Sequence, residues 1–326
     1  MANLDITKAK SNIWSKIGSR ATFGMAVLDL AASVSNLIVL SADTSTSAGL
    51  DRFKKAHPSK YLDCGIAEQN MMGIAAGLAS EGNTVITTTF APFQTMRCCE
   101  QIKVNLGYMD QKVCMVGLAS GLVLGTLGYT HCCIEDLSIM RSIPGITVLS
   151  PADCTETVKA TEAAIKHDGP VYIRLTGGAN NPRVYEEDYE FKIGKSITLR
   201  EGKDISILST GTMVFRTLEV AKILEEQGIA ATVIDVHTIK PVDESMIEKV
   251  CNNAKLMVTV EEHNIVGGLG SAVAEYKSTL KEAPPQLFIG LPDSYGKANE
   301  YSHLIEENNL TTNAIAKSII NAYQKL

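Results

Sequence analysis

The sequence predicts an α/β protein with two consecutive domains, each built around a mainly parallel sheet. Three observations lead to this fold class. The chain has 326 residues, and roughly 150 residues per domain corresponds to about two domains. Short apolar runs alternate with longer segments of helical periodicity, as in parallel sheets that are covered on both faces. A polar segment near the middle interrupts this alternation, so we expect domains at 1–190 and 191–326.

The first domain is expected to contain five buried strands. The runs are short, rich in β-branched residues and almost continuously apolar, which is typical of parallel strands. They occupy residues 37–41, 84–90, 113–117, 146–150 and 171–175. Between the last two runs, Ser150 and Pro151 predict the start of a helix that reaches about His167.

The segment 177–195 reads GGANNPRVYEEDYEFKIGK and has no sustained helical period, so we interpret it as the connection between the domains. Strand and helix patterns then resume. Strands are expected at 204–209, 231–236, 255–260 and 286–290, and helices near 213–227, near 243–252, within 267–280 and after Thr312. The second domain is therefore also predicted to be α/β.

The composition excludes several classes of protein. Hydrophobic residues make up 45% and charged residues 20% of the chain, which excludes a disordered protein. The net charge of −6 has the wrong sign for binding nucleic acid. The first residues lack the apolar core of a secretory signal, and glycines and His131 interrupt the uncharged segment 113–134, which disfavours a membrane span. We therefore expect a cytoplasmic protein without a membrane or nucleic acid partner.

The cysteines do not indicate a metal or redox site. Eight are present, with adjacent pairs but no C-x-x-C spacing. In an intracellular chain we interpret them as small buried side chains. No metal ligands are expected in this chain.

The segment 61–82, YLDCGIAEQNMMGIAAGLASEG, is the most informative for function. A short strand is expected to end at Gly65, and the helix that follows is rich in glycine and alanine, so it can approach another backbone closely. Glu68 lies in its first turn, on the same face as the apolar Met72 and Ala75. Two interpretations remain open: a carboxylate placed for chemistry, or an acid that only complements the helix dipole.

This segment resembles the thiamine-diphosphate enzymes of the transketolase family, and the resemblance extends from about Gly18 to the C-terminus. Residues 65–69 match the family motif G-I-x-E-Q/H. The resemblance implies that Glu68 hydrogen-bonds the aminopyrimidine ring of the cofactor and that Ile66 contacts the cofactor. A carboxylate that shares a proton with the ring favours the tautomer whose neighbouring nitrogen activates the thiazolium carbon. Glu68 is therefore the strongest catalytic candidate.

The segment TTTFAPFQTMRCCEQIK extends the resemblance. In the family, aromatic residues at the positions of Phe90 and Phe93 pack against the aminopyrimidine, which suits a flat ring that needs an apolar wall. Without the resemblance, two such residues would more often belong to the core. Arg97 and Glu100 fit the family helix that follows, where a structural ion pair is as plausible as a catalytic role.

Residues 125–153 match the family loop G-x-T-H-x-x-x-E-D and the helix after it. The resemblance implies that His131 projects into the cleft, where it shuttles protons or polarises the substrate oxygen. An imidazole suits this role because it titrates near neutral pH.

Three further residues are predicted to contact the substrate. Arg174, at the end of its strand, resembles the arginine that binds the sugar phosphate in the family, and a guanidinium there can hold phosphate through two hydrogen bonds. Ser47 and Arg20 fall where the family contacts phosphate or cofactor, although both could equally be turn and cap residues.

A full-length transketolase also carries an amino-terminal domain with a G-D-G segment that binds Mg²⁺ and the diphosphate. No G-D-G occurs in this sequence. The resemblance thus covers the pyrimidine-binding and C-terminal domains, and it implies a separate N-terminal subunit that supplies the metal and diphosphate site. We expect an α2β2 heterotetramer with active sites between unlike subunits.

Three departures from the family pattern concern the substrate. Leu127 replaces an Asp, Ala119 stands near the place of a substrate-contacting His, and Cys132 follows His131 in place of Gln. The loss of polar partners removes contacts to sugar hydroxyl and phosphate groups. The expected reaction is transfer of a two-carbon ketol unit from a ketose phosphate, or from a modified ketose such as a sulfonated sugar, to an aldose phosphate.

Other functions remain open at this point. A deoxyxylulose-phosphate synthase normally keeps both halves in one chain, and the β subunit of a 2-oxo acid dehydrogenase would need a lipoyl-carrying partner. The T-H-x-x-x-E-D loop favours transketolase over the dehydrogenase. A non-catalytic, transketolase-like regulatory partner is a further alternative, which the presence of Glu68, Phe90, Phe93 and His131 together disfavours.

Overall fold

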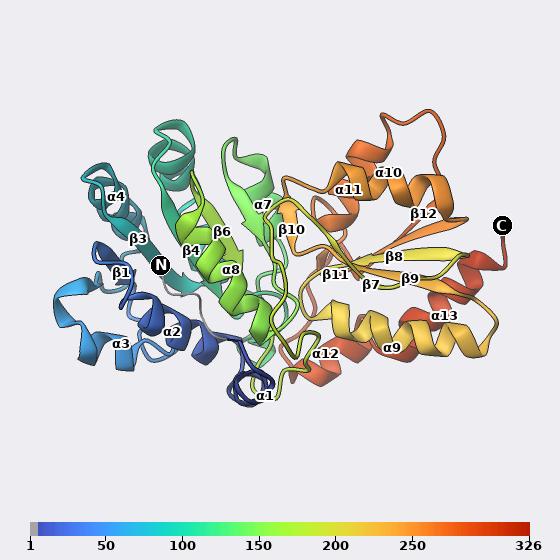
Figure 1. Ribbon diagram of the computed structural model, residues 1–326, viewed down its shortest axis with the longest axis horizontal. Helices are drawn as coiled ribbons and strands as arrows, with labels where there is room; N and C mark the ends of the chain where they lie inside the picture. The colour runs from blue at the N-terminus through green and yellow to red at the C-terminus, as the bar shows by residue number, and fades with distance from the viewer. Residues whose placement is uncertain (1–5) are drawn as a thin grey trace.

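A computed structural model describes residues 6–326 and shows two α/β domains side by side (Figure 1). Each domain has its own sheet with helices on both faces. Most neighbouring strands in both sheets run parallel. The predicted fold class is confirmed.

The first sheet has seven strands in the order β10-β5-β6-β4-β3-β1-β2. Its strands are β1 (Leu37–Ser41), β2 (Tyr61–Asp63), β3 (Thr84–Phe90), β4 (Val113–Leu118), β5 (Thr147–Leu149), β6 (Val171–Arg174) and β10 (Thr238–Lys240). Each of the five predicted runs overlaps one of these strands. β10 is the exception, because it follows the connection in sequence and pairs antiparallel with β5. A segment predicted to lie in the second domain therefore forms an edge of the first sheet.

Helices cover both faces of the first sheet. One face packs against α4 (Glu68–Ser80), the π-helical segment Ile102–Tyr108 and α7 (Asp136–Ser142). The other packs against α2 (Ser19–Leu30), α3 (Asp51–Ala56) and α8 (Cys154–Lys166). The remaining helical segments are α1 (Lys8–Ile17), Pro58–Lys60, α5 (Ala91–Gln94), α6 (Cys99–Gln101) and Gly125–Thr130.

The start of α8 differs from the prediction. The sequence placed the cap and first turn at Ser150 and Pro151, but the N-cap is Asp153, whose carboxylate accepts a hydrogen bond from the backbone N–H of Glu156 at 2.8 Å. Asp153 is the stronger cap because its side chain reaches the free N–H groups of the first turn. The predicted end near His167 is confirmed, since α8 ends at Lys166.

The second sheet has five strands in the order β12-β11-β8-β9-β7. They are β7 (Ile197–Arg200), β8 (Ile205–Ser209), β9 (Ala231–Asp235), β11 (Leu256–Asn264) and β12 (Gln286–Leu291). The helices are α9 (Met213–Glu226), α10 (Glu244–Asn253), α11 (Leu269–Lys277), α12 (Tyr301–Glu307) and α13 (Thr312–Tyr323). All the predicted strands and helices of this domain are present, and α12 and β7 are additional.

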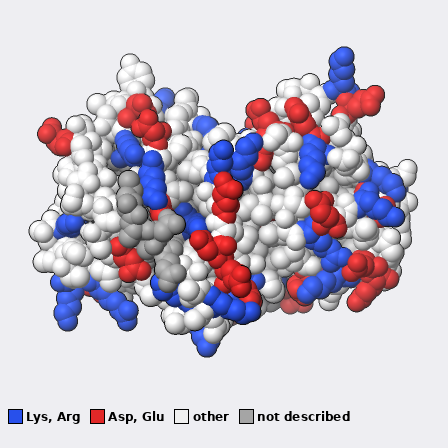
Figure 2. All heavy atoms as spheres, in the orientation of Figure 1, with Lys and Arg blue, Asp and Glu red and all other residues white. Residues whose placement is uncertain are grey.

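Acidic and basic side chains are interspersed on the face seen in Figure 2, without a large area of one sign. No helix in the described part of the chain is long and apolar enough to cross a membrane.

Candidate active site

The candidate active site lies at the carboxyl edge of the first sheet. Parallel strands end at the same edge, so the segments that follow them meet there. Glu68 comes shortly after β2, Phe90 and Phe93 come at and after the end of β3, and His131 belongs to the segment after β4. The topology therefore brings four predicted site residues to one edge.

Glu68 is the first residue of α4, and its side chain is only 3% exposed. Met72 and Ala75, on the same face of the helix, are completely buried. The side chain of Glu68 thus points into the protein and is not exposed to solvent at the start of the helix. A buried carboxylate requires a partner, because removing a charge from water costs several kcal/mol.

Arg97 is that partner. Its Nη1 lies 2.6 Å from Oε1 of Glu68, and its guanidinium stands over the Phe93 ring at 3.9 Å from the ring centroid. Gln69 supports this arrangement by donating its side-chain amide to the Arg97 carbonyl at 3.0 Å. The suggested pairing of Arg97 with Glu100 is wrong, since Glu100 instead accepts a hydrogen bond from Gln101.

Phe90, Phe93 and His131 form an aromatic cluster. The His131 ring meets the Phe93 ring edge to face at 5.4 Å and the Phe90 ring at 6.3 Å between centroids. Nδ1 of His131 is 3.0 Å from the hydroxyl of Thr130. A continuous series of contacts runs from Glu68 through Arg97 and Phe93 to His131. The residues of the predicted catalytic centre therefore lie together.

Arg174 is placed differently from the prediction. Its side chain is 1% exposed, and its Nε is 2.9 Å from Oδ2 of Asp136, which is itself fully buried. Nη2 donates to the carbonyl oxygen of Glu262 at 2.8 Å and to that of Cys133 at 3.4 Å. The structure does not support the predicted phosphate contact, because the guanidinium is enclosed and already bound within the protein.

The remaining predicted contacts lie at the protein surface. Ile66 is 76% exposed, immediately before the helix that carries Glu68. Arg20 is half-buried near the start of α2, and this burial lowers its pKa. The turn that contains Ser47 packs closely against α2, since a Cβ on Gly49 would lie 3.1 Å from the Arg20 carbonyl oxygen. Arg20 and the Ser47 turn are therefore neighbours, but no contact joins them to Glu68.

The three departures from the family pattern occupy unlike environments. Leu127 is 53% exposed in the segment that leads to His131. Ala119 is buried with φ +53°, a left-handed conformation that is uncommon for a residue with a Cβ. Cys132 is 2% exposed, and burial raises the pKa of its thiol to about 11. Of these three residues, only Leu127 has an exposed side chain.

Glu262 is a functional candidate that the sequence did not indicate. It is 1% exposed, and its carboxylate accepts hydrogen bonds from the Leu122 N–H at 2.8 Å and from the Tyr301 hydroxyl at 2.6 Å. Leu122 begins the segment that carries His131, so this acid of the second domain holds that segment. The sequence around Glu262 did not indicate this role, because its partner Leu122 lies 140 residues earlier in the chain.

Comparisons with known proteins identify the family of both domains. Residues 15–181 match the pyrimidine-binding domain of transketolase and residues 194–315 match its C-terminal domain. A 6-deoxy-6-sulfo-D-fructose transketolase subunit from Clostridium sp. is 38% identical over 92% of each chain. An apulose-4-phosphate transketolase subunit from Phocaeicola vulgatus is 38% identical over 87% of this chain and 91% of that one.

A solved structure described as a split gene transketolase, an inactive β4 tetramer, matches with a TM-score of 0.85 and 36% identity, covering 94% of this chain and 98% of that one. Similarity to 1-deoxy-D-xylulose-5-phosphate synthase is weaker: the protein from Parasynechococcus marenigrum is 35% identical, and the match covers 44% of its length. Both domains, the relatives and the solved structure therefore agree, and the chain belongs to the transketolase family.

Proposed function

We propose that this chain is the catalytic pyrimidine-binding subunit of a split transketolase. It acts with a separate subunit that holds the diphosphate and Mg²⁺, and the pair transfers a two-carbon ketol unit from a ketose phosphate, or a related modified ketose, to an aldose phosphate. The observation that carries the proposal is the buried carboxylate of Glu68 close to the Phe93 ring, both of them in contact with the Arg97 guanidinium.

The residues present fit the aminopyrimidine end of thiamine diphosphate. Such a ring needs a carboxylate in dry surroundings and a flat apolar wall. Glu68 is 3% exposed, and the Phe93 ring already accepts a planar cation on its face. The cofactor supplies, when bound, a nucleophilic carbon that carries the two-carbon unit.

The chain's own residues have separate tasks in this site. Glu68 would hold a proton at the ring nitrogen of the aminopyrimidine, and Phe93 would fix the plane of that ring. His131, half-buried against Phe90 and Phe93, would give and take protons at the substrate oxygens. The apolar aromatic cluster limits the water around His131.

The open face of α4 supports the assembly with a partner. A Cβ on Gly73 or Gly77 would meet no atom within 4 Å, although both residues lie in the middle of the helix. Ile66, which lies just before this helix, is 76% exposed. Backbone without side chains allows a second helix to approach closely, so we assign this face to the subunit interface.

The substrate is proposed to be a modified ketose. Leu127 places an exposed apolar side chain close in sequence to His131. It offers no charged hydrogen-bond partner, so it would lower the affinity for sugars whose hydroxyl groups need one. Two relatives named for unusual sugars, the sulfofructose and apulose phosphate transketolase subunits, agree with this proposal.

The test is ketol transfer by the chain combined with its N-terminal partner. Glu68→Gln keeps the shape of the side chain and removes its charge, so we expect kcat to fall by about 100-fold or more, the usual contribution of a general acid or base. Glu100→Gln, an exposed acid on a neighbouring turn, is the matched control. Equal rates for Glu68→Gln and wild type would reject the proposal.

A further inference from the structure

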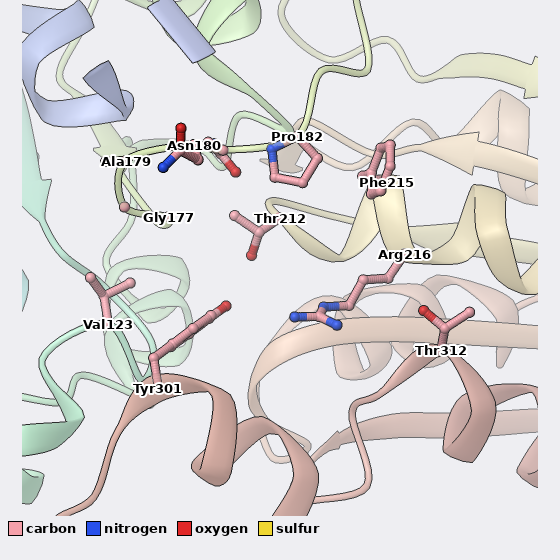
Figure 3. A pocket seen from close by; sticks show the side chains of 12 residues that line it. Val123, Gly177, Ala179, Asn180, Pro182, Thr212, Phe215, Arg216, Tyr301 and Thr312 are labelled. Carbon is pink, nitrogen blue, oxygen red and sulfur yellow. The ribbon is translucent and has the colours of Figure 1, made fainter. Parts of the chain in front are cut away.

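A cavity of about 350 Å³ lies between the two domains (Figure 3). Its walls come from Val123, from the segment 177–182 after β6, and from the starts of α9, α12 and α13. None of Glu68, Phe90, Phe93, Arg97 or His131 lines it. The cavity is therefore separate from the residues of the candidate active site.

Arg216 gives this cavity a positive charge. It is the only charged residue among those that line the cavity, and no acidic side chain lines it. Figure 3 shows its guanidinium pointing into the cavity, toward Thr212 and Tyr301. Within residues 6–326, Arg216 forms neither a hydrogen bond nor an ion pair. A half-buried guanidinium with free N–H groups is a favourable partner for an oxyanion.

The starts of two helices add to the positive charge of the cavity. Thr212 is the N-cap of α9 but makes no side-chain cap, and Thr312 is the first residue of α13; both line the cavity. The first turn of a helix carries free N–H groups and a partial positive charge. The cavity thus combines an unpaired cation with the starts of two long helices.

The nearby acid, Glu262, does not pair with the guanidinium of Arg216. Glu262 lies behind the wall, where its carboxylate accepts hydrogen bonds from Thr212 at 3.1 Å and Tyr301 at 2.6 Å. It is 1% exposed and forms no ion pair with Arg216. These two hydroxyl donors are therefore engaged, and the guanidinium is left for a ligand.

The cavity also touches the segment that carries His131. Gly121 and Cys133 exchange backbone hydrogen bonds of 2.8 and 3.0 Å, which closes this segment into a loop, and Val123 lies just inside the closure. A ligand in the cavity would therefore contact the base of the His131 loop and both domains at once.

We propose that this cavity binds a small organic oxyanion, a phosphorylated or sulfonated metabolite, with Arg216 as its anchor. This site goes beyond the proposed ketol transfer and needs neither the thiamine cofactor nor the partner subunit. The apolar walls at Val123 and Phe215 suit a short carbon body attached to the anionic group.

The test is calorimetric titration of the full chain alone with inorganic phosphate, with glycerol 3-phosphate and with glycerol. We expect saturable binding of both phosphates but not of glycerol. Arg216→Met should weaken phosphate binding at least tenfold, because a charge-assisted contact is lost. Arg183→Met is the matched control: Arg183 follows the cavity segment but pairs with Glu186 at 3.1 Å. It should bind phosphate like wild type.

Two further variants keep the test decisive. Arg20→Met changes the arginine predicted to contact the substrate phosphate, so unchanged binding would locate the anion in the cavity and not at the active site. Gly178→Leu adds a large side chain at the cavity wall, where a Cβ meets no atom within 4 Å, so we expect it to obstruct the cavity while the fold is retained. It should abolish binding and replaces Arg216→Met if that variant does not fold. Absence of saturable binding, or equal binding by Arg216→Met and Arg183→Met, would overturn the proposal.

Discussion

Arg97 occupies the two contacts that the proposed cofactor needs. Its guanidinium binds Glu68 at 2.6 Å and covers the Phe93 ring at 3.9 Å, so an aminopyrimidine can reach both groups only if Arg97 moves away. A hydrogen bond to a charged group contributes about 1.5–3 kcal/mol. Because the Arg97 side chain is 41% exposed, solvent screening reduces this contribution to about 1–1.5 kcal/mol.

Removing this competitor should therefore tighten cofactor binding. In Arg97→Met, thiamine diphosphate no longer displaces an ion pair, and about 1–1.5 kcal/mol corresponds to a dissociation constant lower by roughly five- to tenfold. Titration of the reconstituted pair with the cofactor, followed by near-ultraviolet circular dichroism, measures the constant directly. Lys103→Met, which removes an exposed cation a few residues away, should bind the cofactor like wild type.

The opposite result would refute this reasoning. If Arg97→Met binds the cofactor more weakly than wild type, Arg97 remains at Glu68 in the loaded enzyme and positions its carboxylate. Thermal unfolding of the chain alone gives an independent measure, because the variant leaves the buried Glu68 without its cation. We expect a loss of about 1–3 kcal/mol, the cost of an unsatisfied buried group.

Four further outcomes are expected. Arg174→Met should destabilise the chain by about 3–5 kcal/mol in urea unfolding, because it leaves Asp136 as an unpaired buried charge; a loss below about 1 kcal/mol would contradict this. Burial raises the pKa of Asp235 to about 7, so the folded state holds an extra proton and loses stability as pH rises from about 4 to 7. Asp235→Asn should remove that part of the slope, which melting curves at several pH values will show. Gly77→Leu should leave the fold of the chain intact and block its assembly with the partner, as measured by light scattering. Leu127→Asp should raise kcat/KM for unmodified ketose phosphates about tenfold through a charged hydrogen bond, with no gain expected for a sulfonated ketose.

The strands were predictable because their signal is local. The run 37–41 coincides with β1 and the run 84–90 with β3, since both are short runs rich in apolar and β-branched residues, a signal that does not depend on the neighbouring strands. β10 could not be found this way. It is three residues long and owes its existence to pairing with β5 across about ninety residues of chain, and short segments carry too little pattern for a prediction.

The candidate site was predictable where a residue's role follows from its own position, and not where it depends on a distant partner. The burial of Glu68 follows from its place on an apolar helix face, whereas its predicted catalytic role came from the resemblance to the transketolase family. Arg97 was expected beside Glu100 on the assumption of a regular helix, but the chain there is broken into α5, α6 and a π-helical segment, so residues three apart do not align. Arg174 was expected to bind phosphate because it resembles a family arginine at a strand end, and nothing local indicated its buried partner Asp136, which lies 38 residues earlier in the chain.

The second domain takes part in the site by fixing the loop that carries His131. Glu262 accepts the N–H of Leu122 at the start of the loop, and Arg174 donates to the carbonyl oxygens of Cys133, at the end of the loop, and of Glu262. One end of the loop is therefore bound directly to β11, and the other end is connected to β11 through Arg174 of β6. A change in how the domains pack would shift the imidazole of His131 relative to Glu68, which lies on a helix of the first domain alone. The relative placement of the two proposed catalytic residues thus depends on an interface that contains neither of them.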